Sequence, residues 1–262
     1  MKKLTGLFIL VSIFVLRIAV AEVDWEKAII RISDTNQSRL SLRLRNELYA
    51  LQYDDDRTVG EFLRSNFDRE SRLLGLLNEY HRPEQHYLTD GSIDYMYQLP
   101  MTNKVMALLL PETKPVKLVV PMLCPSCGQE WPHGKSIPGN MVLIPKQIET
   151  IEYTGIVIDC RDFKITPCLF PKIYNEMAEE IYSVNFADSR NVIDNGLVAY
   201  STSDLNNNPR IGGNPLRIKA IGVLGNKRTD IKISSLDARN FHGSNKNLQL
   251  LKECRVTIIF AP

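Results

Sequence analysis

The chain has 262 residues, 44% of them hydrophobic, and a formal net charge of +2. This length allows one large domain or two modest ones, and the composition is that of a globular protein. The charge is too small to indicate a general attraction to nucleic acid or to an anionic membrane surface.

The first 21 residues have the parts of a secretory signal peptide. Lys2 and Lys3 are followed by an apolar run over 4–16, and small residues precede the expected cleavage after Ala21. A membrane anchor is the alternative, but Arg17 interrupts an apolar run that is short for a spanning helix. Removal of the segment lowers the basic residues from 32 to 29 against 30 acidic ones, a net charge of −1. The prediction is an exported protein that keeps no transmembrane segment.

Residues 22–112 are predicted to form a small α+β domain. Leucines at helical spacing predict one helix over 36–51, for which Asn36 and Ser38 are alternative caps. Thr58 is expected to cap a second, shorter helix. The buried stripe of the first helix is Leu40, Leu44, Leu48 and Leu51, and that of the second is Val59, Phe62, Leu63 and Phe67.

Two runs, 72–81 and 84–101, are interpreted as β-like. In the second run the pair Asp90-Gly91 indicates a hairpin turn, and the side chains from Ile93 to Leu99 alternate in polarity. A short helix over 103–110 then ends at Pro111. Helices on one face of an antiparallel sheet give this region its α+β class.

The rest of the chain divides into an irregular junction and a β-rich domain. Prolines, glycines and two cysteines gather at 113–150, and two apolar pieces, 116–123 and 140–145, are candidates to pair across it. Over 151–262, short apolar runs recur at short intervals. This spacing predicts a β-rich domain, such as a sandwich or a partial barrel, with helical turns before the last strand.

The segment CPSC is the strongest candidate for chemistry. Cys124 and Cys127 supply two ligands of a tetrahedral zinc site, and His133 is a candidate third. A second CxxC is absent, so the fourth ligand would come from another cysteine or a carboxylate. A thioredoxin-like centre is less favoured, because Pro132 and nearby glycines prevent a helix from starting there. In an oxidising compartment the leading interpretation is a disulfide, either Cys124–Cys127 or a longer-range pair.

Other catalytic patterns are missing from the sequence. It contains no GxSxG, HExxH, GxxxxGK[ST] or GxGxxG motif. His81 and His86 are expected on a solvated strand end and His242 in a loop, and Asp159 is expected to close a turn with Arg161. The prediction is therefore a protein without catalytic residues and without a cofactor, with zinc as the alternative.

The stretch EYTGIVIDCRDFKITPCLFPKIY resembles a bacterial envelope signature that usually has the pattern YTGLVIDARG…PALSPRI. The chain resembles the LPP20-like envelope proteins and the N-terminal region of the flagellar assembly T protein over 152–262, and more loosely upstream. The residues that carry the likeness are Tyr153, Thr154, Gly155, Ile158, Asp159, Pro167, Pro171, Lys172 and Ile173, continuing through Gly196 and Pro215.

The resemblance implies a periplasmic protein built into or around an envelope machine such as the flagellar basal body. The hypothesis drawn from it is a non-enzymatic assembly or scaffold role with protein partners in the envelope, in which a homo-oligomer is one arrangement, and no catalytic residue is carried over. Cys160 and Cys168 replace small residues of the usual pattern and could form a disulfide across a turn. Gly212 and Gly213 are expected to allow a positive φ before the strand that Pro215 begins.

Overall fold

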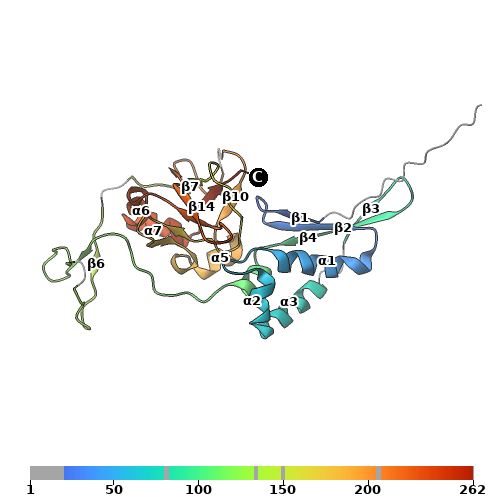
Figure 1. The fold of residues 1–262 in the computed structure, drawn as a ribbon, viewed down its shortest axis with the longest axis horizontal. Coiled ribbons are helices and arrows are strands. Elements are labelled where there is room, and N and C mark those ends of the chain that lie inside the picture. Colours follow the sequence, from blue (N-terminus) through green and yellow to red (C-terminus); the bar gives the residue numbers. More distant parts are fainter. Residues whose placement is uncertain (1–20, 80–82, 133–134, 149–150, 205–207, 262) are drawn as a thin grey trace, which may run out of the picture.

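The structure is a computed structural model that describes residues 21–79, 83–132, 135–148, 151–204 and 208–261. The described part is a mixed α+β protein, as predicted. Figure 1 shows a body made of the N-terminal and C-terminal regions, with an arm that projects from the end opposite β3. Residues 1–20 of the predicted signal segment, together with His81 and His133, lie outside the described residues, and Ala21 is the first residue of β1. In the described part, no helix has the length and apolar character needed to cross a membrane.

The N-terminal region is an antiparallel sheet covered by helices. Its four strands lie in the order β1-β2-β4-β3, and Gly91 makes the predicted turn between β3 and β4 with a φ of 83°. Helix α1 packs on this sheet through the predicted leucines and is capped by Asn36. The elements are β1 (Ala21–Asp24), β2 (Ile29–Asp34), α1 (Gln37–Ala50), β3 (Glu84–Tyr87) and β4 (Ile93–Pro100).

Three more helices complete this region, α2 (Val59–Arg64), α3 (Phe67–Glu79) and α4 (Lys104–Leu109). The Thr58 cap is confirmed, because its side chain and that of Glu61 form a reciprocal capping box. Two predictions are wrong. The run 72–81 is largely the helix α3, whose Leu73, Leu76 and Leu77 are buried at helical spacing, and Phe67 is 81% exposed where burial was expected.

The C-terminal region contains two four-stranded sheets. The central sheet, β10-β14-β7-β11, is parallel throughout, and the second sheet, β12-β13-β8-β9, is mixed. The strands are β7 (Ile156–Asp159), β8 (Ile173–Tyr174), β9 (Glu180–Tyr182), β10 (Ala199–Ser201), β11 (Leu216–Lys219), β12 (Gly222–Leu224), β13 (Asp230–Lys232) and β14 (Val256–Ile259). The helices are α5 (Ser189–Asn195), α6 (Ser235–His242) and α7 (Asn245–Lys252), with a 3₁₀ turn at Val184–Phe186.

The parallel sheet departs from the sandwich or partial barrel that the strand spacing suggested. Strand β14 is buried at every position and β7 at all but Asp159. Strands buried on both faces, with helices in the connections between them, are typical of parallel sheets. The C-terminal region is therefore β-rich, as predicted, but its central sheet needs α5, α6 and α7 to connect and cover it.

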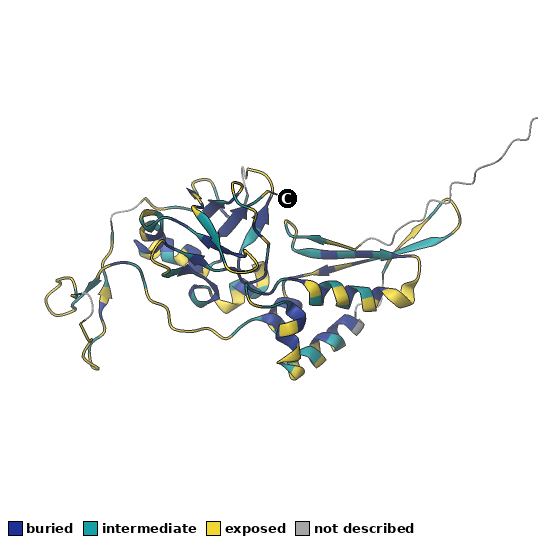
Figure 2. Ribbon diagram, in the orientation of Figure 1, coloured by how far each residue is buried: buried dark blue, intermediate teal, exposed yellow. Residues whose placement is uncertain are grey.

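The two regions of the body share one hydrophobic core (Figure 2). The Leu169 and Phe170 amides donate to the carbonyls of Gln52 and Tyr53 at 3.0 and 2.9 Å. At the opposite side of the junction, the rings of Trp25 and Tyr200 meet edge to face with centroids 5.4 Å apart. Backbone hydrogen bonds and shared burial therefore fix the N-terminal region against the C-terminal one.

The arm comprises residues 121–146. Among its described residues, the only regular strand pairing is β5 (Met122–Leu123) with β6 (Ile144–Pro145), a shorter ladder than the two predicted apolar pieces allowed. The base of the arm is fixed to the turn between α6 and α7. There the Ile148 amide donates to the Gly243 carbonyl at 2.8 Å, and the Asn245 amide donates to Gln147 at 3.2 Å. Figure 1 shows the rest of the arm extending away from the body.

Candidate binding groove

A groove of about 430 Å³ lies where the two regions of the body meet. Its walls come from the end of α1 to α3, from the segment that follows α4, and from β8 to the 3₁₀ turn. The charged residues that line it are Arg57, Arg69, Lys114 and Lys172 with Asp54, Glu112 and Glu180. A second hollow of about 320 Å³ shares Lys114, Glu180 and Asn185 with the groove and continues along 115–119.

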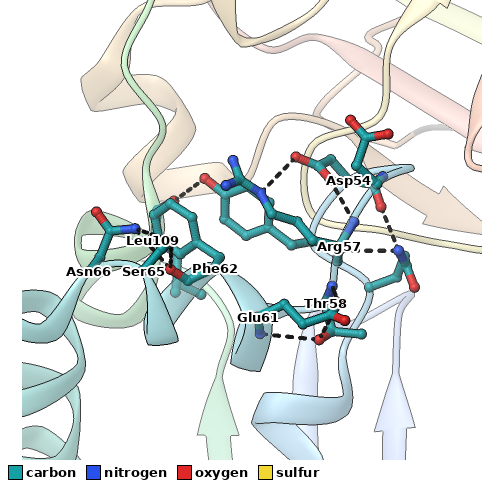
Figure 3. A network of polar contacts seen from close by, with 11 residues as sticks. Asp54, Arg57, Thr58, Glu61, Phe62, Ser65, Asn66 and Leu109 are labelled. Atoms are coloured by element: carbon teal, nitrogen blue, oxygen red, sulfur yellow. Dashed lines mark hydrogen bonds and ion pairs between the residues drawn. The ribbon is translucent and has the colours of Figure 1, made fainter.

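Two aromatic residues, Tyr53 and Phe62, line the groove. Figure 3 shows Phe62 within the polar network that includes Asp54 and Arg57. Tyr53 and Phe62 are stacked, with ring centroids 4.3 Å apart and planes inclined by 14°. The Tyr53 hydroxyl donates to the Leu109 carbonyl at 2.9 Å, which fixes the stack against the end of α4. Burial raises the pKa of the Tyr53 hydroxyl well above its usual value, so this donor keeps its proton.

Two guanidinium groups lie over this aromatic wall. The Arg57 guanidinium is 5.0 Å from each ring centroid, and that of Arg69 is 5.5 Å from the Phe62 centroid. Arg57 Nε donates to Asp54 Oδ2 at 3.3 Å. Arg69 donates instead to the Leu110 carbonyl at 2.6 Å, and no carboxylate of the described chain lies within salt-bridge distance of it. The wall therefore presents cationic groups that are held in place over aromatic faces.

Lys172, one of the signature residues, lines the groove from the C-terminal region. Its side chain is half-buried, and no described carboxylate forms an ion pair with its ammonium. Burial lowers the pKa of this ammonium, but the nearby Tyr174, Asp230 and Glu180 outweigh burial and raise the pKa above its usual value. Lys172 is therefore charged at neutral pH, and the groove gathers positive charge from both regions.

Two other signature residues, Thr154 and Gly155, contact the loop at 211–214, and this contact is called the clasp. The Thr154 hydroxyl donates to the Ile211 carbonyl at 2.7 Å and accepts from the Asn214 amide at 2.9 Å. A Cβ on Gly155 would lie 2.4 Å from the Ile211 Cα, so only glycine fits under this loop. Gly212 has the expected positive φ of 67°, whereas Gly213 does not, so that prediction holds for one of the two glycines.

The remaining signature residues stabilise turns and the junction. Asp159 accepts from the Arg161 guanidinium at 2.6 and 3.0 Å and from its amide at 3.0 Å, which confirms the predicted turn. This hydrogen bonding from Arg161 lowers the pKa of the Asp159 carboxyl. Pro167 and Pro171 bracket the strand-like segment that pairs with Gln52 and Tyr53. Tyr153 and Pro215 flank the clasp, and Gly196 ends α5 with a φ of 76°.

The cysteines fall into two groups. Cys160, Cys168 and Cys254 are buried, and burial raises the pKa of the Cys160 thiol to about 12 and that of Cys254 to about 11. Cys124 and Cys127 lie on the arm, with Cys127 exposed. All five cysteines are free thiols in the structure, which therefore gives no support to the predicted disulfides. No described group of three or more histidine, cysteine or acidic side chains could hold a metal ion.

The CPSC segment is a tight loop with its backbone hydrogen bonds closed. The Cys124 amide donates to the Gln129 carbonyl at 2.8 Å, and the Gly128 amide donates to the Cys124 carbonyl at 2.8 Å. Gly128 has a φ of 69°, which favours glycine. The amides of Cys127 and Ser126 are directed at the Cys124 sulfur, and their hydrogen bonds lower the pKa of its thiol. The predicted third ligand, His133, lies outside the described residues.

His242 attaches the segment before the arm to α6, and its predicted place in a loop is wrong. It is the last residue of α6 and only 1% exposed, whereas His86 lies on an exposed strand as predicted. His242 Nδ1 accepts from the Val119 amide at 3.0 Å, and Nε2 lies 2.8 Å from the Ile181 carbonyl. The ring is therefore neutral with its proton on Nε2, and burial lowers its pKa to about 4.

We expect this histidine to make stability depend on pH. Its pKa is about 4 in the folded chain and about 6.5 when unfolded, so its contribution is complete above pH 6.5 and is lost as pH falls toward 4. Between pH 7 and pH 5, this histidine should lower the free energy of unfolding, measured in urea, by about 1–2 kcal/mol. His242→Gln should lack this part of the pH dependence. Asp230, whose burial raises its carboxyl pKa to about 6, acts in the opposite sense, so each variant is compared with the wild type at both pH values.

His86→Gln is the matched control for this measurement. His86 is exposed on β3, so its replacement should leave the pH dependence of the wild type unchanged. Equal pH profiles for His242→Gln and the wild type would contradict the assignment of a neutral, buried ring.

Among known families, one model of a bacterial domain matches the C-terminal region. The family model described as Treponema pallidum Tp0624, second domain, matches residues 155–262. These residues are similar to that domain. The match begins at Gly155, the glycine under the clasp, and includes Lys172 on the groove wall. No curated protein matches the chain. The likeness to LPP20-like and flagellar T proteins stays a prediction.

Sequence patterns did not reveal the groove. Phe62 was expected in the core, and it is buried, but Arg57 and Arg69 were not singled out. The charged run from Asp54 to Arg57, placed directly before a helix cap, was the one available signal. Lys172 was identified only as part of the signature, with no indication that it faces residues more than a hundred positions earlier.

Proposed function

We propose that the protein is an exported, non-enzymatic envelope protein that binds an acidic segment of a partner protein in the groove. The observation that carries the proposal is the gathering of Arg57, Arg69 and Lys172 around stacked aromatic rings at a rigid junction. Guanidinium groups held over aromatic faces recognise carboxylates and also offer apolar contact. An assembly role in the periplasm, in a flagellar or another envelope machine, fits such a surface.

The lining of the groove also favours binding over catalysis. Its described residues include neither histidine nor cysteine. Its one serine, Ser183, is 1% exposed, and its hydroxyl donates to Glu180 at 2.6 Å and accepts from the Asn185 amide at 3.0 Å, so it is held in the cap of the 3₁₀ turn. The guanidinium and ammonium groups of this lining can bind and orient an anionic group.

Site-specific photo-crosslinking in intact cells tests the proposal. Glu112 lines the groove with an exposed side chain, and Gln249 is an exposed control on α7. A photoreactive residue at 112 should crosslink an envelope protein several-fold more than one at 249. The double variant Arg57→Gln/Lys172→Gln should remove most of this adduct because it removes charge from both walls.

The control for charge is Arg39→Gln/Lys252→Gln, which removes two exposed basic residues outside the groove. This variant should keep the adduct. Equal crosslinking from positions 112 and 249, or an adduct that survives Arg57→Gln/Lys172→Gln, would contradict a binding role for the groove.

A zinc-binding or thiol-redox role is the second candidate, and the CPSC loop favours it. Two backbone amides directed at the Cys124 sulfur stabilise a thiolate, which is both the zinc ligand and the redox-active form of cysteine. This candidate uses the arm and leaves the groove free, so the two roles can coexist.

A further inference from the structure

The arm cannot be stable through its own packing. Of its described residues, only Leu143 is buried, and its one regular feature is the pairing of β5 with β6. Chain segments of this size bury too little apolar surface to hold a fixed shape and usually need a metal, a disulfide or a partner. Backbone hydrogen bonds nevertheless close the CPSC loop, from the Cys124 amide to the Gln129 carbonyl and from the Gly128 amide to the Cys124 carbonyl. Something outside the arm's own side chains is therefore needed to stabilise it.

The CPSC loop has the form of half a tetrahedral zinc site. Leu123 and Glu130 pair as an isolated bridge, and the loop between them turns back at Gly128. The Cys127 side chain is exposed and that of Cys124 is partly exposed. Two cysteines at this spacing occupy two corners of a zinc tetrahedron, and a structural site needs four ligands.

The remaining three cysteines of the same chain do not supply the other two zinc ligands. Cys160, Cys168 and Cys254 are each at most 1% exposed and lie in the body. The arm projects away from the body and is fixed at its base by the hydrogen bonds to Gly243 and Asn245 (Figure 1). Bringing a buried thiol to the arm would require unpacking the body, so these three cysteines cannot complete the site.

We propose that Cys124 and Cys127 from two copies of this chain together bind one Zn²⁺ and join the copies arm to arm. Such a site has four sulfur ligands, the arrangement of closed structural zinc sites. Four thiols release their protons when the site forms, and the resulting tetrathiolate centre carries a charge of −2. The inference concerns the arm alone and does not depend on the groove.

A second copy fits the surface of the arm better than a partner of other chemistry. Ile137, Val142 and Ile144 are exposed apolar side chains on the arm, with Val142 83% exposed. Contact between two arms would cover these side chains on both copies. The charged residues of each arm are two lysines, Lys135 and Lys146, and one glutamate, Glu130. Lys146 pairs with Glu130 at 2.6 Å. The small positive charge left on each arm is compensated by the negative zinc centre.

The test measures zinc content, mass and metal environment of the purified full chain, kept reduced and free of chelator. We expect a dimer with one Zn²⁺ shared by two chains, and an X-ray absorption spectrum with only sulfur neighbours at about 2.3 Å. Removal of zinc by a chelator should return the protein to monomers. Cys124→Ser/Cys127→Ser should abolish zinc binding and dimerisation while leaving the melting temperature of the body unchanged, because these residues lie outside its core.

His133→Asn separates the shared site from a site within one chain. It should leave zinc content, mass and the sulfur-only spectrum unchanged. A monomer with one zinc per chain that His133→Asn removes would overturn the proposal. So would a Cys124–Cys127 disulfide in the isolated protein, or a dimer that persists in Cys124→Ser/Cys127→Ser. Because none of these residues lines the groove, either result is independent of the crosslinking outcome.

Discussion

Gly155→Ala is expected to destabilise the protein by more than about 3 kcal/mol, at the upper end of the range for overpacking. The added Cβ would lie 2.4, 2.7 and 2.9 Å from the Cα, carbonyl oxygen and carbonyl carbon of Ile211. These are backbone atoms, which cannot rotate away as the end of a side chain can. Ile211 is fully buried, and the Thr154 hydroxyl holds its carbonyl, so the loop has no room to retreat. Urea unfolding monitored by circular dichroism measures the loss.

Gly213→Ala in the same loop is the matched control. No atom lies within 4 Å of a Cβ at this position, and its φ is not positive. Alanine there should leave stability unchanged or raise it by about 0.5 kcal/mol, because it restricts the unfolded chain. If Gly155→Ala and Gly213→Ala had equal effects, the close approach of Ile211 could not be the reason that glycine occupies position 155.

The clasp illustrates what the sequence could and could not predict. The signature identified Thr154, Gly155 and Pro215 as a group, but nothing in a linear pattern says that Gly155 lies under Ile211. Local rules succeeded where the cause is local. The leucine spacing predicted α1, and Thr58 with Glu61 predicted the start of α2. They failed at α3, because a leucine-rich run that contains Gly75 and few polar residues has a periodicity that both a helix and a strand can explain.

The groove and the parallel sheet could not be predicted for a related reason. Both depend on which segments become neighbours, and that choice is made by packing across the whole core. Arg69 faces the groove because α3 is a helix, which the sequence interpretation missed. Lys172 faces it because the segment before it pairs with Gln52 and Tyr53 in the other region. Sites assembled from distant segments need the tertiary fold before their members can be recognised together.

The junction between the two regions gives the second large prediction. The backbone of residues 225–229 wraps around the carboxylate of Asp55. That carboxylate accepts from the Asn226 and Lys227 amides at 2.7 and 3.0 Å and from the Thr229 hydroxyl at 3.2 Å. Successive amides around a carboxylate form an anion-binding turn. Asp55→Ala should therefore lower the free energy of unfolding by about 2 kcal/mol, the range for hydrogen bonds to a charged group.

Gly225→Ala should be more damaging, with a loss above about 3 kcal/mol. Gly225 has a φ of 88°, and a Cβ there would lie 2.0 Å from the Asp55 Cγ. The two substitutions are therefore coupled. In Asp55→Ala/Gly225→Ala the carboxylate that causes the clash is gone, so the double variant should be more stable than the sum of the single losses predicts, by at least about 1 kcal/mol. Urea unfolding of the four proteins of this cycle measures the coupling.

Asp56→Ala is the control for charge at the neighbouring position. Its exposed carboxylate has no ion pair or hydrogen bond with any described residue, so its loss should change stability by less than about 0.5 kcal/mol. Hydrogen exchange adds a local measurement, because the Asn226 and Lys227 amides should exchange faster in Asp55→Ala and at the wild-type rate in Asp56→Ala. Strict additivity in the cycle, with unchanged exchange at both amides, would show that Asp55 does not hold the two regions together. The rigid groove depends on that attachment, since Asp55 follows Asp54 and lies two residues before Arg57 on the chain.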